Sequence, residues 1–317
     1  MTFRTTRRGL MQGAGIAGAA LAAGPAAAQV RFPARELSWL IYQAPGGSID
    51  LTARIIQPFL AEQGVRTNLD YAIGAGGRIA RTRVFRAQKD AYTIMTESSP
   101  GAVMDEVLGN AEYKALDFEP IFGWSVIGWQ FCVRKDSPIR TFTDFVNECR
   151  RRRVTMGTIG RGGSSHLQVE VLKKRVGINF DIVHFDGSGR AYPAVMGGHV
   201  GVACAGPASG SRNRENLHFI GLTRPEPALP DVPTLAQQGF PQVESVDQLW
   251  YALTTPGSPE NRVARLEEAF AKAFESSELR ERMERAGEAA VLLTRAQLRV
   301  AVTDHLRLVR ENRDLMT

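Results

Sequence analysis

Short apolar runs that fit β-strands alternate with stretches whose apolar residues recur at helical spacing. The first strand is predicted at residues 37–42, and Leu51 to Leu60 form the apolar face of the helix that follows. Ser48 is suited to cap the start of this helix, and Gly64 to end it. The same pattern predicts later strands near residue 69, at 92–95, ending near 134, at 154–157, at 182–185, near 200 and 219, and at 249–253.

Helical patterns separate most of these strands. They begin at residues 78, 143, 166 and 190, a short one follows 230–235, and two long ones cover 260–286 and 294–313. Because strands and helices alternate, we expect an α/β fold with mixed, largely parallel sheets flanked by helices.

The order of these elements indicates two lobes. A chain of 317 residues is long enough for two hydrophobic cores, and the strand at 249–253 returns to the first lobe after the second is complete. We expect lobe one to contain residues 29–133 and 252–317, and lobe two residues 134–251. A ligand would then lie between the lobes, where loops leave the strand ends.

The first 28 residues have the pattern of a cleaved export signal. Arg7 and Arg8 precede an uncharged run of Gly and Ala that ends in three alanines. Paired arginines before a weakly apolar segment resemble the twin-arginine signal, which a receptor reads. The alternative, a membrane anchor, is disfavoured because residues 9–24 are short and dominated by Gly and Ala. We expect cleavage after Ala28 and a soluble periplasmic protein.

Charge and cysteines exclude several classes of function. The net charge of +6 falls to +3 without the signal, because that segment holds three arginines and no acid. The four arginines at 150–153 close a predicted helix, where cations suit the dipole, and export also argues against nucleic acid. Cys132, Cys149 and Cys204 lie far apart without paired histidines, so we expect no metal site and no cofactor. Three free thiols are the simplest interpretation, and one disulfide between two of the cysteines is the alternative.

Seven short motifs occur in a fixed order along the chain. They are GGSID at 46–50, GAGG at 74–77, DAYT at 90–93, GRGGSSHL at 160–167, GSGRA at 187–191, LPDVPTL at 229–235 and GFP at 239–241. Together they resemble the Bug family, the substrate-binding receptors of tripartite tricarboxylate transporters, over essentially the whole mature chain. The resemblance implies the two-lobed type II periplasmic-binding-protein fold. It also implies a monomeric, non-enzymatic receptor that hands a small carboxylate to the membrane subunits of such a transporter.

Three segments depart from the family pattern. Tyr42 and Gln43 replace the usual Pro-Phe, residues 69–73 replace VENRP, and residues 184–187 replace PYKG with an acidic residue in the basic position. These departures make the identity of the ligand less transferable than the fold.

A carboxylate buried between lobes needs donors, and backbone N–H groups at helix N-termini provide them. The Gly-rich loops at 46–50 and 160–166 precede helices of opposite lobes and allow close approach, so a bridging carboxylate would draw the lobes together. The resemblance assigns carboxylate binding, partly through water, to Gly47, Ser48, Asp50, Ser164 and Ser165. To these we add, as further lining residues, Ala75, Gly76, Gly163, His166, Phe185, Asp186 and Ser188.

Several of these residues have a second interpretation. Ser48, Asp50 and Ser164 could only cap helices, and Asp50 would meet a carboxylate through water rather than directly. The loop at 74–77 could be a plain turn. Asp186 could pair with an amino group of the ligand or be a solvated loop charge.

Three other functions compete with that of a transport receptor. Ser165 beside His166 suggests a hydrolase. Adjacent residues at the start of a helix point in different directions, however, and neither Ser164 nor Ser165 lies in the GxSxG turn that carries a nucleophilic serine. GxGxxG at 13–18 lies in the export signal with no preceding strand, so it does not indicate a nucleotide site. A ligand-sensing receptor for a signalling partner remains open, and neighbouring genes would distinguish it from a transport receptor.

Overall fold

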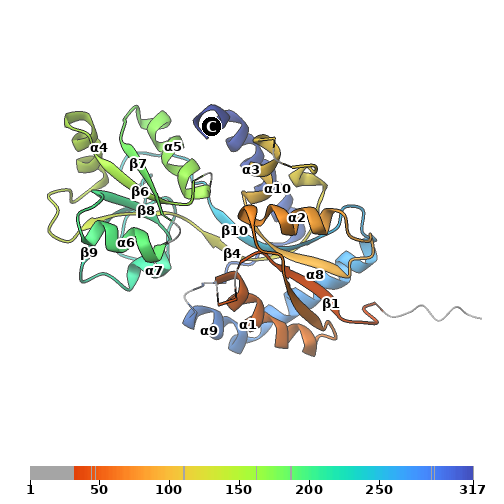
Figure 1. Cartoon of the computed structure of the whole chain (residues 1–317). Helices are drawn as coiled ribbons and strands as arrows, with labels where there is room; N and C mark the ends of the chain where they lie inside the picture. The colour runs from red at the N-terminus through yellow and green to blue at the C-terminus, as the bar shows by residue number, and fades with distance from the viewer. Residues whose placement is uncertain are drawn as a thin grey trace, which may run out of the picture.

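The computed structural model describes residues 32–316 except 44, 47, 110, 162, 186, 187, 287 and 289. The predicted export signal lies outside the described residues. Within them the chain forms two lobes, each built on a five-stranded sheet (Figure 1). No helix of this part is both long enough and apolar enough to span a bilayer.

The sheet of lobe one is mixed. Its strand order is β2-β1-β3-β10-β4, in which β1 pairs in parallel with β2 and β3 whereas β10 runs antiparallel to both of its neighbours. Four strands therefore point one way and β10 the other. The bounds are β1 (Leu37–Ile41), β2 (Thr67–Tyr71), β3 (Thr93–Ser99), β4 (Glu119–Ile127) and β10 (Gln248–Thr254).

The sheet of lobe two repeats this plan. Its order is β7-β6-β8-β5-β9, and β5 is the reversed strand between β8 and β9. In each lobe the reversed strand is the one that has just crossed from the other lobe, so the largely parallel direction predicted from sequence is confirmed. The bounds are β5 (Gln130–Arg134), β6 (Thr155–Ile159), β7 (Asp181–Phe185), β8 (Val202–Ala205) and β9 (Leu217–Leu222).

Helices cover both faces of the first sheet (Figure 1). One face packs against α1, α8 and α9, where Phe270 of α8 stacks on Trp124 of β4 with ring centroids 5.9 Å apart. The other face packs against α2, α3 and α10. The bounds are α1 (Ser48–Glu62), α2 (Arg78–Phe85), α3 (Gly101–Val107), α8 (Glu260–Glu275), α9 (Ser277–Arg285) and α10 (Arg295–Glu311), with short 3-10 turns η1 (Ala75–Gly77), η2 (Ala115–Asp117) and η3 (Arg313–Leu315).

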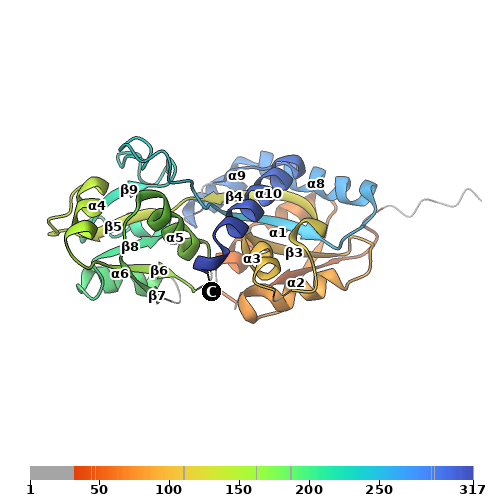
Figure 2. The same cartoon turned by 90° about the horizontal axis from the view of Figure 1, so that it is seen from above.

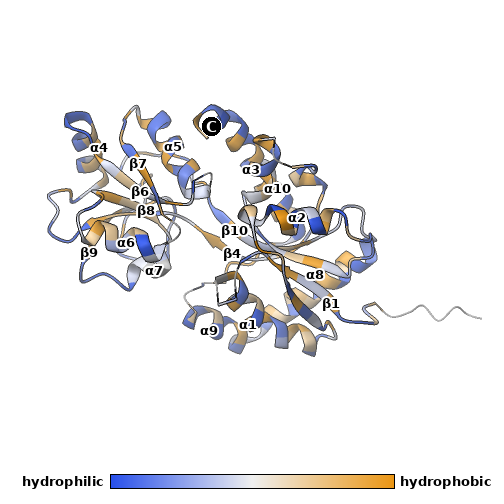
Figure 3. Cartoon of the chain, viewed as in Figure 1, coloured by the Kyte–Doolittle hydropathy of each residue, from blue (hydrophilic) through white to orange (hydrophobic). Residues whose placement is uncertain are grey.

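The second sheet is covered in the same way, and Figure 3 shows apolar segments gathered on the sheets with polar segments on the outer helices. Thr141 starts α4 through a capping box, because its hydroxyl accepts from Asp144 N and the Asp144 carboxylate accepts from Thr141 N. The bounds are α4 (Phe142–Arg151), α5 (Ser164–Val176), α6 (Ser188–Met196) and α7 (Pro207–Ser211).

Two sequence expectations about helices were wrong. The helix predicted at 260–286 breaks at Ser276, whose extended backbone ends α8 and whose hydroxyl caps α9. The short helix after 230–235 is a series of turns, in which Gln238 N donates to Thr234 O and Leu235 O. That segment pairs with lobe two instead, through a bridge between Leu222 and Thr234.

The chain crosses between the sheets twice. The first crossing is residues 128–129, between β4 and β5, and the second ends just before β10. The boundaries predicted at 133/134 and 251/252 fall inside β5 and β10. Because each strand belongs whole to one sheet, we propose lobe boundaries at residues 128–129 and shortly before Gln248.

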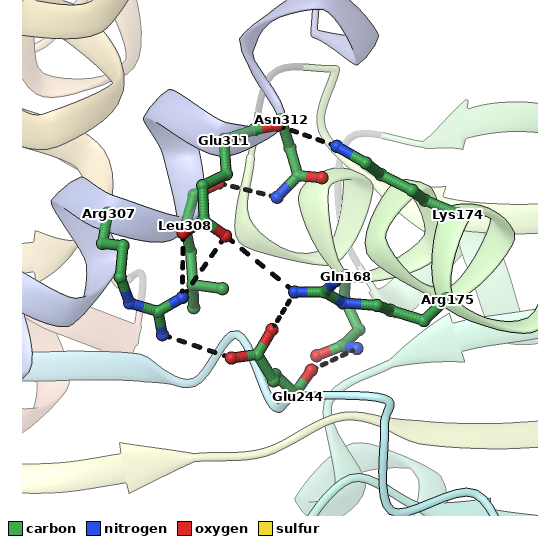
Figure 4. A network of polar contacts seen from close by, with 8 residues as sticks. All are labelled: Gln168, Lys174, Arg175, Glu244, Arg307, Leu308, Glu311 and Asn312. Atoms are coloured by element: carbon green, nitrogen blue, oxygen red, sulfur yellow. Dashed lines mark hydrogen bonds and ion pairs between the residues drawn. The ribbon is translucent and has the colours of Figure 1, made fainter.

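A third link joins the lobes without covalent bonds. Helix α5 of lobe two lies beside the end of α10, whose C-terminal turn stands between the lobes (Figure 2). Glu244, on the second crossing, accepts from Arg175 of α5 at 2.7 Å and from Arg307 of α10 at 3.2 Å (Figure 4). Lys174 Nζ donates to Glu311 O at 2.9 Å. Buried Leu167 and Val171 of α5 belong to the same apolar cluster as Leu308 of α10.

Candidate functional site

A cleft of about 850 Å³ separates the two lobes where the loops leave the strand ends. Lobe one contributes the end of β1, the loop at η1, the start of α3 and the end of β4. Lobe two contributes the β6–α5 loop, the start of α6 and the β8–α7 loop. This is the position that the strand and helix pattern predicted for a ligand.

The structure brings five of the predicted site residues to this cleft. They come from three Gly-rich loops in both lobes and are Ala75, Gly76, Gly163, Ser164 and Ser188. Gly163 and Ser164 stand where α5 begins, so the first backbone N–H groups of that helix lie at the cleft wall without intrahelical acceptors.

The GAGG loop has the backbone of a tight, left-handed turn. Gly76 and Gly77 have φ of 62° and 95°, and Ala75 has φ of 47°, which is uncommon for a residue with a side chain. A Cβ on Gly77 would lie 3.0 Å from Arg81 Nη2 and 3.1 Å from the Tyr42 ring. Glycine at this position therefore lets the loop pack onto two side chains that line the cleft.

Three other predicted residues lie away from the cleft. The Ser165 hydroxyl is fully buried, accepts from Ile159 N at 2.9 Å and donates to Ile159 O at 2.8 Å. The His166 ring faces His184, with centroids 4.5 Å apart, in a separate hollow beside β7. Phe185 packs over Gly157, where a Cβ would come within 2.9 Å of its ring.

Asp50 is buried in its own helix rather than on the cleft wall. Its carboxylate accepts from Gly46 N at 2.8 Å and from Arg54 Nε at 3.1 Å, and Tyr71 also donates to it. Burial opposes ionisation, but these hydrogen bonds outweigh it and lower the pKa of Asp50. Ser48 is the first residue of α1, and Gly47 and Asp186 lie outside the described residues.

A buried ionic cluster at the cleft was not predicted from sequence. Arg81, 1% exposed, donates to Glu97 at 2.7 Å and to Asp105 at 2.7 Å, and Tyr113 donates to Asp105 at 2.7 Å. Burial, reinforced by the charge of Glu97, raises the pKa of nearby Tyr42 to about 12. Gly101 leaves room for this cluster, because a Cβ there would lie 2.0 Å from Arg81 Nη2.

Four further charged residues line the cleft and were also missed. They are Arg161, Arg212, Glu226 and Glu288, and among the described residues none of them forms an ion pair. Burial raises the pKa of Glu288 to about 7, the hydrogen bond from Ser125 partly offsets it, and the charge of Glu226 adds to it. Burial also raises the pKa of Glu226.

The chemistry of these groups is suited to binding. No group of three or more His, Cys, Asp or Glu in the described part of the chain could hold a metal ion. The Ser165 hydroxyl donates to a backbone carbonyl and the His166 ring packs against His184, so the two do not form a nucleophile and base at the cleft.

A sequence model of the tripartite tricarboxylate transporter family receptors matches residues 53–311. The chain belongs to this family. BugT of Bordetella pertussis is 28% identical over 289 residues, 87% of each chain. A Pseudomonas protein described as "UPF0065 protein in tcbD-tcbE intergenic region" is 28% identical over 267 residues, covering 81% of this chain and 79% of the relative.

Solved structures agree with the fold of this receptor. A ligand-free solute-binding protein of the same family from Polaromonas has a TM-score of 0.81 at 19% identity, covering 89% of this chain and 99% of its own. MatC from Rhodopseudomonas palustris, solved with malate, has a TM-score of 0.71 at 24% identity, covering 90% and 100%. The predicted family and two-lobed type II fold are therefore confirmed, and both are those of solute-binding receptors rather than enzymes.

Proposed function

We propose that this receptor captures a small carboxylate in the cleft between its lobes and delivers it to the membrane subunits of a tripartite tricarboxylate-type transporter. The observation that carries the proposal is the start of α5, where Gly163 and Ser164 bring helix N-terminal N–H groups to the cleft. Arg161 and Arg212, which form no ion pair among the described residues, add positive charge on the same lobe.

Relatives support a carboxylate as the ligand class. Two proteins of Rhodopseudomonas palustris with this fold were solved with malate and with adipate. Both molecules are small acids, and a cleft of about 850 Å³ is large enough for a solute of this size. We propose the same class for this chain.

A thermal-shift screen tests the binding role. Mono-, di- and tricarboxylates, aromatic acids and acidic amino acids would be added to the mature protein. A true ligand at a hundredfold excess over its dissociation constant should add roughly 2.7 kcal/mol to the free energy of unfolding. Arg212→Ala should weaken binding, whereas Arg150→Ala, an exposed arginine of α4 away from the cleft, should not. A library that shifts the melting temperature nowhere contradicts the proposal.

We also propose export through the twin-arginine route. The proposal rests on Arg7 and Arg8 before the Gly/Ala run, and family receptors work in the periplasm. Changing both arginines to Lys should block export, so that the uncleaved precursor accumulates in the cytosol. Normal processing of that double variant would indicate a general secretory signal instead.

A further inference from the structure

Two acidic side chains face the cleft from opposite sides. Glu288 follows α9 in lobe one, and Glu226 lies on the return segment after β9 of lobe two. Both are partly withdrawn from water, and neither forms an ion pair among the described residues. Ser125 Oγ donates to Glu288 Oε2 at 3.4 Å, a long hydrogen bond that compensates little of the lost hydration.

Charges of both signs act on this pair. Glu226 and Glu288 repel one another, and Asp247 adds a third negative charge beside Glu226. Arg224, the cation near Glu226, is engaged by Asp247 at 3.0 Å, and Arg212 is the cation that acts on Glu288. Moving the lobes together would bring the two carboxylates closer, so closure favours a positive charge between them.

The cleft also offers donors, although the indole of Trp250 is not one of them. Trp250 lies opposite Ser125 in the β10–β4 pairing, lines the same cleft and is 5% exposed. Its indole Nε1 is buried in the apolar core of lobe one and has no acceptor among the described residues, so it is not a donor for a molecule in the cleft. The donors that the cleft offers come from Arg161 and the start of α5, and its acceptors include two carboxylates that form no ion pair among the described residues. A molecule that satisfies both must carry an acidic and a basic group.

We infer that Glu226 and Glu288 form a subsite for the cationic group of the ligand, so that this receptor selects small zwitterionic acids over plain dicarboxylates. The inference rests on the proposed function, because the carboxylate end of the ligand is the part held by α5 and the arginines. An ammonium group between the lobes is attracted by both acids and offsets part of their negative charge as the cleft closes. A second carboxylate at the same position is repelled by them.

Calorimetric titration with matched pairs of equal chain length tests the inference. The pairs are glutamate with glutarate, aspartate with succinate, and 4-aminobutyrate with butyrate. The ammonium-bearing member of at least one pair should bind tenfold or more tighter, and Glu288→Gln and Glu226→Gln should each reduce this preference about tenfold. Glu284→Gln removes an equal charge from exposed α9 and should leave the preference unchanged. Unliganded melts of the variants check folding.

The pH dependence supplies a second readout. Glu288 has a pKa of about 7 and is faced by Glu226 and Arg212, so it ionises between pH 6 and pH 8. Affinity for the ammonium ligand should rise over this range, and Glu288→Gln should flatten the rise. Equal or tighter binding of the plain acids, with no change in Glu288→Gln, overturns the inference while the proposed function stands. Failure of every acid to bind overturns both.

Discussion

The guanidinium of Arg81 on α2 and the carboxylate of Glu97 on β3 form an ion pair 2.7 Å long that is almost completely shielded from water. Glu97 Oε1 also accepts from Ala102 N at 3.2 Å, so the pair ties α2 to the start of α3 at the cleft. Removing one partner would leave the other charge buried and unpaired.

Arg81→Met should therefore lower the free energy of unfolding by about 3–5 kcal/mol. The matched control is Arg83→Met, two residues along the same helix, whose ion pair with Asp70 is exposed and should contribute less than about 1 kcal/mol. Urea melts of both variants measure the difference. An equal decrease in the free energy of unfolding in both variants would show that the buried ion pair of Arg81 contributes no more than the exposed one of Arg83.

Ser165 and Ser164 should separate stability from affinity. Ser165→Ala leaves Ile159 N and O without their partner and should reduce stability by about 1–3 kcal/mol, with affinity almost unchanged. Ser164 lies on the cleft wall, so Ser164→Ala should weaken binding of a carboxylate tenfold or more if its hydroxyl donates to it. Titration beside a denaturant melt measures both quantities. The reverse pattern would place Ser165 at the ligand.

His305 should make the protein sensitive to mild acid. It is buried on α10 with Nδ1 2.8 Å from Ser99 Oγ, and burial lowers its pKa to about 4. Between pH 6.5 and 4 the unfolded state binds a proton that the folded state does not, so stability falls as pH falls. The loss at pH 5 should be about 2 kcal/mol for this residue.

The test for His305 is a comparison of stability between pH 7 and pH 5. His305→Gln should show a shallower decline than the wild type, whereas exposed His199→Gln should match the wild type. His166, whose pKa burial also lowers to about 4, should keep part of the decline in the His305 variant. An unchanged slope in His305→Gln would contradict the assignment.

The cysteines should be unreactive in the native protein. Cys132 and Cys204 are buried on the paired strands β5 and β8, and all three cysteines are free thiols. Burial raises the pKa of Cys132 and of Cys149 to about 12, which removes the reactive thiolate at neutral pH. A thiol reagent should therefore label the folded protein slowly and release three equivalents after unfolding without reductant. One equivalent would reveal a disulfide.

Most of the fold could be predicted because its signals are local. Gly-rich loops mark the ends of strands, and apolar periodicity marks the helices that follow. Three helices and strands were not predicted: β4, in which residues 120–125 are buried without alternation, α3, which has seven residues and two acids, and α7, which has five residues. Short, continuously buried runs give no period from which strand or helix can be read.

The site was harder to predict because it depends on direction and on distant pairing. The helix expected from His166 begins at Ser164, and successive residues of a helix turn by about 100°, so Ser164 faces the cleft while Ser165 turns to Ile159. Arg81, Glu97 and Asp105 come from three separate elements, and Glu288 stands in a loop. Nothing local in the sequence indicates that these residues meet.

The contact of α5 with α10 decides from which edge this molecule can admit a solute. Separating the two helices would expose Leu167, Val171 and Leu308 to water and break the links of Glu244 to both lobes. We therefore expect opening to widen the cleft along the edge that lacks this contact and to leave the shape of the α5–α10 edge unchanged. A docking partner that contacts the α5–α10 edge would bind the receptor with or without ligand. A partner that contacts the opposite edge of the cleft would distinguish the ligand-bound receptor from the empty one.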